Sequence, residues 1–237
     1  MNVTAEILAE ILAHAGEAAP RECCGFIVQF KHHQRYVRAR NIAESDDDFV
    51  VHPDDYTAAE DSGEVLMIVH SHYGVPPNPS DADRKGCELS ALPWLIVNYP
   101  TGAYQIIEPC GYKAPLIGRN YCYGVLDCLT LVQDYYEEVM GIMLPKYEYE
   151  EDWWLKGANH YQELYPSAGF VAVNPSEIKA HDMILMQVDS PVLNHAGIYL
   201  GDGIFLHHPY KALSCRRPYG GYWQKHTGLV CRHKDVK

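Results

Sequence analysis

The chain has little positive charge. Its 237 residues hold 19 Lys and Arg against 31 Asp and Glu, which gives a formal net charge of −12 at pH 7. This balance argues against a nucleic-acid binder held by phosphate contacts. No apolar run approaches the ~20 residues of a membrane span. The first twenty residues carry Glu6, Glu10 and Glu17 and lack a basic start, so we expect no secretory signal peptide.

The chain also lacks the cysteine spacing of a disulfide scaffold. Its eight cysteines are scattered, and none of them belongs to a CxxC pair. We therefore expect free thiols and a reducing compartment. No internal repeat is visible. What the chain does have is hydrophobic content, 47% of its residues, which is enough for globular cores.

The charge is divided unevenly, which indicates two units. Residues 1–115 hold 8 basic and 17 acidic side chains, whereas residues 116–237 hold 11 and 14. The first part alternates helix and strand patterns, so we predict an α/β domain over 1–113. The second part opens with a helix near 127–140 and continues with strands, so we predict an α+β domain over 114–237.

Local signals place the elements. Thr4 is the predicted N-cap of a helix that ends before Pro20, and Ser80 is the predicted N-cap of another. A further helix over 52–63 ends at Gly63. Apolar and alternating runs predict the strands, and one more helix is expected near 157–165. The predicted strands are 23–30, 35–40, 65–72, 93–100, 103–109, 182–188, 195–201, 203–209 and 228–233.

His70 and His72 end a buried strand and stand two residues apart, so their side chains share one face. Asp83 lies three residues into the helix capped by Ser80 and is expected to face back toward the strand end. Two His nitrogens and one carboxylate leave the fourth position of a tetrahedral zinc open for water. The ion would lower the pKa of that water from about 15.7 to near 7, and Glu22 is the candidate general base. The alternative is a pair of surface histidines.

The pattern of Glu22, His70-x-His72, Ser80 and Asp83 resembles the JAMM metalloprotease family, also called Mov34 or MPN domains. The resemblance implies a cytidine-deaminase-like α/β fold. It implies Zn²⁺ held by the two histidines and Asp83, Glu22 as acid and base, and Ser80 as the donor that steadies an oxyanion. A plain helix-capping role for Ser80 is compatible with this. Family members cleave amide or isopeptide bonds, and some only scaffold.

Neighbouring residues offer alternatives to this ligand set. Asp81 could replace Asp83 as the ligand, although the family register favours Asp83. Cys23 and Cys24 stand beside Glu22 and could touch the metal, but the implied set is complete without them.

A second candidate site centres on Cys128, which begins a helix whose unpaired amides and dipole would stabilise a thiolate. The alternative is a packed core cysteine. His195 opens an apolar strand and is the candidate base. If residues 201–203 make a hairpin turn, His207 becomes its cross-strand neighbour and can orient it. His208 alternates to the other face and is interpreted as a bystander.

Three segments, YCYGVLDC, NHAGIYLGDG and FLHHP, resemble in order the blocks of the NlpC-type peptidases, a papain-like clan. The resemblance covers about residues 117–235 and implies a catalytic Cys-His-His triad. Tyr121 resembles the tyrosine that precedes the cysteine in that family. Leu129 and Thr130 replace the usual Ser-Gly after the cysteine, a departure that bears on substrate preference. Family members cleave cell-wall peptides, often beside D-Glu and diaminopimelate.

A JAMM-like domain followed by an NlpC-type domain resembles the tail-tip assembly proteins of long-tailed phages. The resemblance implies synthesis in the host cytoplasm and a place at the distal tail tip of the virion. It implies contact with tail-tip and hub proteins and local cutting of peptidoglycan peptides. Two alternatives stay open. One is a structural tail-tip component with little or no activity. The other is a bacterial isopeptidase that removes a ubiquitin-like tag, and the second domain counts against it.

Overall fold

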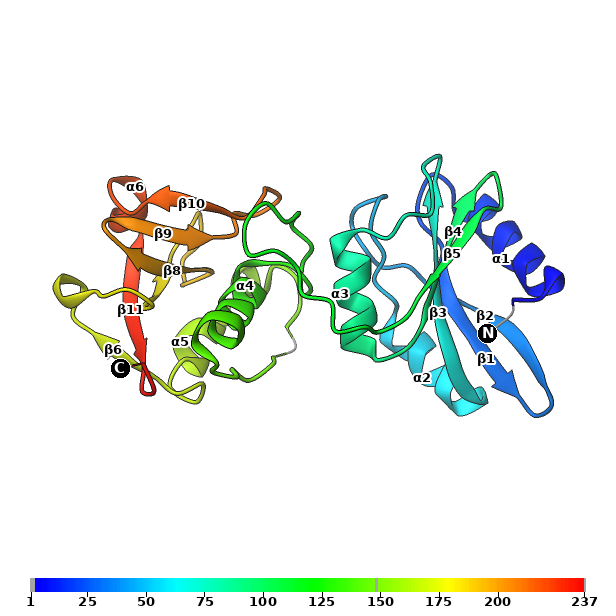
Figure 1. Cartoon of the computed structure of the whole chain (residues 1–237), viewed down its shortest axis with the longest axis horizontal. Helices are drawn as coiled ribbons and strands as arrows, with labels where there is room; N and C mark the ends of the chain where they lie inside the picture. Colours follow the sequence, from blue (N-terminus) through cyan, green and yellow to red (C-terminus); the bar gives the residue numbers. More distant parts are fainter. Residues whose placement is uncertain (1–2, 148, 237) are drawn as a thin grey trace. The chain divides into compact units, whose positions relative to one another are not determined.

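The computed structural model describes residues 3–147 and 149–236 (Figure 1). The chain forms two compact units, Met1–Lys113 and Ala114–Lys237. Each unit has its own β-sheet and its own buried core. Among the residues that the structure describes, no helix has the length and apolarity that crossing a bilayer requires.

The first unit is built on a five-stranded sheet of order β2-β1-β3-β4-β5. β3 and β4 run parallel, and the other neighbours are antiparallel. The predicted α/β class is confirmed, and each predicted element of this unit is present. Its elements are α1 (Ala5–Ala18), β1 (Cys24–Phe30), β2 (His33–Ala39), α2 (Pro53–Ser62), β3 (Glu64–Tyr73), α3 (Asp81–Ser90), β4 (Trp94–Tyr99) and β5 (Tyr104–Ile107).

The two faces of this sheet are both covered, which is why its central strands are mostly apolar. α1 buries its apolar stripe against one face, in a cluster that includes Ile7, Ile11, Met67 and Val69. On the other face, Ala59 of α2 and Cys87 of α3 pack in a second cluster, which includes Phe26, Ile68 and Trp94. Helices on both faces leave the end of β3, with its histidines, at the edge of the layers.

The end of the first unit is fastened to α3. The Glu88 carboxylate accepts hydrogen bonds from the backbone amides of Cys110, at 2.6 Å, and Tyr112, at 2.9 Å. The Tyr112 hydroxyl donates to Asp81 Oδ1 at 2.5 Å. Segment 110–112 is therefore held on the helix that carries Asp83.

The second unit has a six-stranded antiparallel sheet of order β10-β9-β8-β7-β11-β6. The predicted α+β class is confirmed. Its strands are β6 (Phe170–Val173), β7 (Met183–Met186), β8 (His195–Gly201), β9 (Ile204–His207), β10 (Cys215–Pro218) and β11 (Thr227–His233). Its helices are α4 (Cys128–Tyr135), α5 (His160–Leu164) and α6 (Tyr222–Lys225), with 3-10 turns at Trp153–Lys156 and Pro175–Glu177.

α4 lies against the sheet and supplies Leu131, Val132 and Tyr135 to the core of this unit. The helix predicted over 127–140 is present, but its last turn, Tyr136–Met140, is π-helical and ends at Gly141, whose φ is 66°. The helix expected near 157–165 is shorter, His160–Leu164.

Two strands of the second unit were not predicted. β6 has only four residues, and β10 reads Cys-Arg-Arg-Pro, a charged edge strand without the apolar alternation that marks a half-buried strand. β6 pairs with β11, which lies far along the chain, whereas β10 pairs with β9, the strand that precedes it.

A buried ion pair ties the entry of the second unit to α4. Arg119 is fully buried, and its Nη1 lies 2.6 Å from Asp134 Oδ2. The Arg119 backbone also exchanges hydrogen bonds with Ser214. These contacts hold the segment that leads to Asp127 and Cys128.

Candidate active sites

The first site gathers side chains from three elements at one end of the sheet. β3 carries His70 and His72 on one face, and its register places His70 opposite Cys24 of β1. Glu22, two residues before Cys24, is therefore brought to the same end. α3 contributes Asp83 from its first turn. The structure thus brings together the four side chains that the sequence singled out.

The distances show one convergent cluster. His70 Nε2 and His72 Nε2 are 3.3 Å apart, and Asp83 Oδ1 and Oδ2 lie 3.2 Å and 3.6 Å from these two nitrogens respectively. Glu22 Oε1 lies 3.8 Å from His72 Nε2. Ligand atoms of Glu22, His70 and His72 all fall within 4.8 Å of one another. Either carboxylate is placed to reach an ion held by the two histidines.

The second nitrogen of His72 indicates how this ring is presented, and ring packing holds His70. His72 Nδ1 lies 3.2 Å from the Pro76 carbonyl, which can only accept, so Nδ1 carries the proton and the Nε2 lone pair is free for a cation. His70 is fully buried and stacks on Phe49 with ring centroids 4.5 Å apart. Two nitrogens and two carboxylates, nearly dry and aimed at one point, fit a divalent zinc ion.

Burial and hydrogen bonding shift the pKa values of the two carboxyl groups of the cluster in opposite directions. Burial raises the pKa of Glu22 to about 8, although His72 lowers it. Burial also raises the pKa of Asp83, but hydrogen bonds from His70 and His72 bring it well below its usual range. Burial lowers the pKa of His70. The site therefore holds one carboxyl disposed to keep a proton and one disposed to stay charged, which suits a base and a ligand.

Ser80 is the N-cap of α3. Its Oγ accepts from the Asp83 amide at 3.0 Å, and the Asp83 Oδ2 accepts from the Ser80 amide at 2.7 Å, which completes a capping box. The oxyanion role of Ser80 remains a prediction. Asp81, the alternative ligand, is bonded through Oδ1 to the Tyr112 hydroxyl. The geometry therefore favours Asp83.

The second site lies where α4 meets β8 and β9. Asp127 is the N-cap of α4 and accepts from the amides of Leu129 and Thr130, which places Cys128 at the first helical position. The hairpin between β8 and β9 turns at Asp202 and Gly203, whose φ values of 50° and 69° are those of a tight two-residue turn.

The hairpin register brings the two histidines together. His207 pairs with Gly197, so His195, two residues away on the same face, is its diagonal neighbour. His195 Nε2 lies 3.0 Å from His207 Nδ1. Cys128 and His195 line one cavity of about 260 Å³. The sequence-predicted trio therefore meets at one place.

Burial dominates the protonation of this site. Burial, and after it the neighbouring Asp127 carboxylate, raises the pKa of Cys128 to about 12. Burial lowers the pKa of His195 to about 3 and that of His207 to about 4. Sulfur and imidazole are thus both neutral at rest. Proton transfer from one to the other has to be assisted by hydrogen bonds to the ions that form.

Two other predicted positions lie on the cavity wall. Tyr121 lines it and meets the ring of His208 edge-on at 5.2 Å. His208 also lines the cavity, so the expectation that it lies on the far face was wrong, while its interpretation as a bystander stays a prediction. Strand alternation does not extend to it because β9 ends at His207.

Sequence reasoning missed two aromatic residues of the site. The Tyr161 hydroxyl lies 3.3 Å from Cys128 Sγ. The Trp223 ring packs on His195 and His207, with centroids 5.9 Å and 4.5 Å away. Neither residue has a spacing or neighbouring motif that ties it to Cys128, because the chain folds back over long distances to place them.

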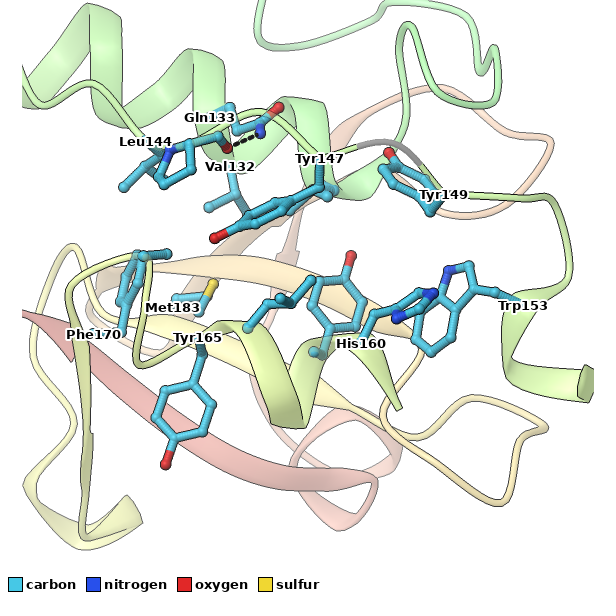
Figure 2. Close-up of a pocket in the computed structure, with 15 residues that line it drawn as sticks. Val132, Gln133, Leu144, Tyr147, Tyr149, Trp153, His160, Tyr165, Phe170 and Met183 are labelled. Atoms are coloured by element: carbon cyan, nitrogen blue, oxygen red, sulfur yellow. Dashed lines mark hydrogen bonds between the residues drawn. The ribbon is translucent and has the colours of Figure 1, made fainter. Parts of the chain in front are cut away.

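A second cavity, of about 320 Å³, adjoins the first (Figure 2). Its wall is almost entirely aromatic and aliphatic, and Figure 2 shows Tyr147, Phe170, Met183 and Trp153 arranged around it. The two cavities share four wall residues: Leu129, Tyr149, Trp153 and Tyr161.

Comparison with known families defines the class of protein. Residues 4–106 match the family described as prokaryotic homologs of the JAB domain. Residues 118–232 match the NlpC/P60 family. The chain is therefore a two-domain protein of peptidase and hydrolase families, and the predicted order of the two domain classes is confirmed.

Individual relatives define the family more closely. Tail tip assembly protein K of Escherichia phage N15 is 42% identical over 232 residues, which covers 96% of this chain and 94% of that protein. Tail tip assembly protein K of Escherichia phage lambda is 39% identical over 182 residues, covering 77% and 88%. Desampylase of Pyrococcus furiosus is 35% identical over 83 residues, covering 32% and 59%. The chain belongs to the tail tip assembly protein K family.

Proposed function

We propose that this protein is a phage tail-tip peptidase whose Cys128 site cleaves amide bonds of peptidoglycan peptides during cell-wall penetration. The observation that supports this most is the cavity that Cys128 and His195 line together. Cys128 opens α4, and His207 holds His195 through a contact of 3.0 Å. Membership of the NlpC/P60 family supports the peptidase class. The names of both phage relatives support the place in the tail tip.

The proposed reaction follows from the tautomer that the site requires. For the Nδ1 atom of His195 to accept a proton, its Nε2–H has to donate to His207 Nδ1. His195 takes the proton of the Cys128 thiol, and the sulfur attacks the amide carbonyl carbon. The C–N bond breaks as His195 returns the proton to the leaving amine. Water, deprotonated by His195, then hydrolyses the thioester and regenerates the thiol.

The first unit is proposed to hold Zn²⁺ through His70, His72 and Asp83. When bound, the ion would supply Lewis acidity and a water of lowered pKa. Glu22, buried 3.8 Å from His72, is placed to take up a proton and pass it on. Ser80, at the start of α3, is placed to donate a hydrogen bond to a developing oxyanion. The bond that this site cleaves would be an amide or an isopeptide bond.

In the virion, the proposed neighbours are the tail-tip and hub proteins, and the proposed substrate is the peptide part of bacterial peptidoglycan. A second candidate function is a structural role in tail-tip assembly with little turnover. The neutral resting state of Cys128 and His195 favours this alternative, as does the word assembly in the names of both phage relatives.

Turnover of purified wall peptides by the full chain separates the two candidates. We expect new amino termini to appear in the peptides and Cys128→Ala to lower kcat/KM by at least about 10³-fold, as loss of a nucleophile does. Cys122→Ala is the matched control, because Cys122 is another cysteine of the second unit and is not among the residues that line the cavity. Absence of turnover in the wild type would leave the structural role. Equal turnover in the Cys128 variant would contradict Cys128 as the nucleophile and assign the cleavage to another site.

A further inference from the structure

A phenol from a distant helix contacts the proposed nucleophile. Tyr161 Oη lies 3.3 Å from Cys128 Sγ, within the range of a hydrogen bond to sulfur. Thirty-three residues separate the two along the chain. The hydroxyl therefore meets the one atom of the site that has to become negatively charged.

The Tyr161 ring is held firmly by its surroundings. It meets the Trp153 ring edge-on at 5.8 Å and packs against the core cluster of α4 and the sheet. It also stands in the wall shared by the two cavities. Figure 2 shows Trp153 and the neighbouring His160 side by side, and their rings are 4.7 Å apart. A ring fixed in this way presents its hydroxyl to the sulfur without further ordering.

We propose that Tyr161 is a further catalytic residue of the Cys128 site, whose phenolic O–H donates a hydrogen bond to the sulfur and stabilises the thiolate that attacks. This inference rests on the proposed function of Cys128 as a nucleophile. In the resting thiol either atom can donate. Once the thiol has lost its proton, only the phenol can.

The charges around the sulfur create the need for such a donor. Asp127 lies next to Cys128 and opposes a thiolate, and burial opposes it more. The stabilising contacts are the Tyr161 hydroxyl and the backbone amides of Ala196 and of Cys128 itself. Burial keeps the pKa of Tyr161 well above its usual range, so the phenol retains the proton that it donates. The other titratable groups on the cavity wall are Tyr121, Tyr123, Tyr149, Asp189, His195, His208 and Tyr210.

The test is the pH dependence of Cys128 alkylation by iodoacetamide in the full chain, followed at that cysteine by peptide mass spectrometry. In Tyr161→Phe the ring stays and the donor is lost. We expect the apparent pKa of Cys128 to rise by about one and peptide turnover to fall about tenfold, the size of a hydrogen bond to a charged group. Tyr165→Phe is the control. It lies on the same helical segment, and Figure 2 shows its hydroxyl pointing away from the cavity.

A second variant guards against misfolding of the first. Replacement of Tyr161 by 3-fluorotyrosine keeps the shape and makes the phenol a stronger donor, so the apparent pKa of Cys128 should fall and alkylation at neutral pH should become faster. An unchanged alkylation profile in either folded variant overturns the inference. If Cys128→Ala retains full turnover, the proposed function itself fails, whatever Tyr161 does.

Discussion

The two histidines of the second site differ in their position relative to the cavity. His195 shares the cavity with Cys128, whereas His207 is fully buried behind it, stacked on Phe205 at 4.4 Å and edge-on to Trp223. In the described part of the chain, His207 Nε2 has no hydrogen-bond partner. In the proposed reaction, His207 therefore acts through His195, as a positioning residue.

Replacing His207 by Phe should remove the 3.0 Å hydrogen bond while the ring stack stays. We expect kcat to fall by about 10²- to 10⁴-fold with little change in KM, because the base loses its tautomer and not its substrate contacts. Steady-state kinetics on wall peptides measure both constants. His208→Phe is the comparison, since His208 lines the cavity but lies outside the hydrogen-bonded pair. A larger kcat loss in His208→Phe than in His207→Phe would contradict these roles.

At the scale of single residues, the sequence was informative only where the residues of a site lie close together in the chain. His70-x-His72 on a strand and Cys128 behind an N-cap could be read directly, because side-chain direction follows from local backbone geometry. Tyr161 could not be found, since nothing local links a tyrosine on one helix to a sulfur on another. His208 was misjudged because strand alternation was extended one residue beyond the strand.

At the scale of elements, capping residues explain why the helices begin where they were predicted. Thr4 accepts from the Ile7 amide at 3.3 Å, and Ser80 and Asp127 each complete a capping box. The strands β6 and β10 could not be predicted. β6 owes its place to pairing with β11, far along the chain, and β10 is a charged strand without the apolar alternation of a half-buried strand.

The pair between Arg119 and Asp134 is a buried ion pair that joins the entry of the second unit to α4. In the described residues, Arg119 Nε and Nη2 have no hydrogen-bond partner, so its charge depends on Asp134. Asp134→Ala should lower the free energy of unfolding of the second unit by about 3–5 kcal/mol, because it leaves a buried cation uncompensated.

The matched control for this prediction is the exposed pair Lys156–Glu150, whose atoms are also 2.6 Å apart. Glu150→Ala should cost about 0–1 kcal/mol, since water replaces the lost partner. Urea unfolding followed by tryptophan fluorescence gives both values. Equal losses in the two variants would show that burial of the pair around Arg119 does not set its contribution.

At the scale of the whole molecule, the chain is two units with separate cores and separate sites. The first unit carries the acidic excess and the candidate metal cluster, and the second carries Cys128. The predicted division into an α/β and an α+β part was accessible from charge and from the order of patterns. The interior of each site was not, because it depends on contacts between residues far apart in the sequence.

Zinc should therefore stabilise one unit and not the other. We expect a calorimetric scan of the full chain to show two unfolding transitions. The midpoint temperature of one should rise with added Zn²⁺, which corresponds to about 2.7 kcal/mol of added stability at 100 times the Kd, and the midpoint temperature of the other should not change. His70→Ala should abolish the shift and leave alkylation of Cys128 unchanged, whereas Asp81→Asn should keep the shift. A zinc-dependent shift that survives His70→Ala would place the metal elsewhere.

The hydrogen bonds that Glu88 accepts from the amides of Cys110 and Tyr112 affect how force passes along the chain. A pull on the chain beyond Lys113 reaches α3 through these two hydrogen bonds before it reaches the sheet. α3 also carries Asp83, so tension on the connecting segment is transmitted to a side chain of the proposed metal centre.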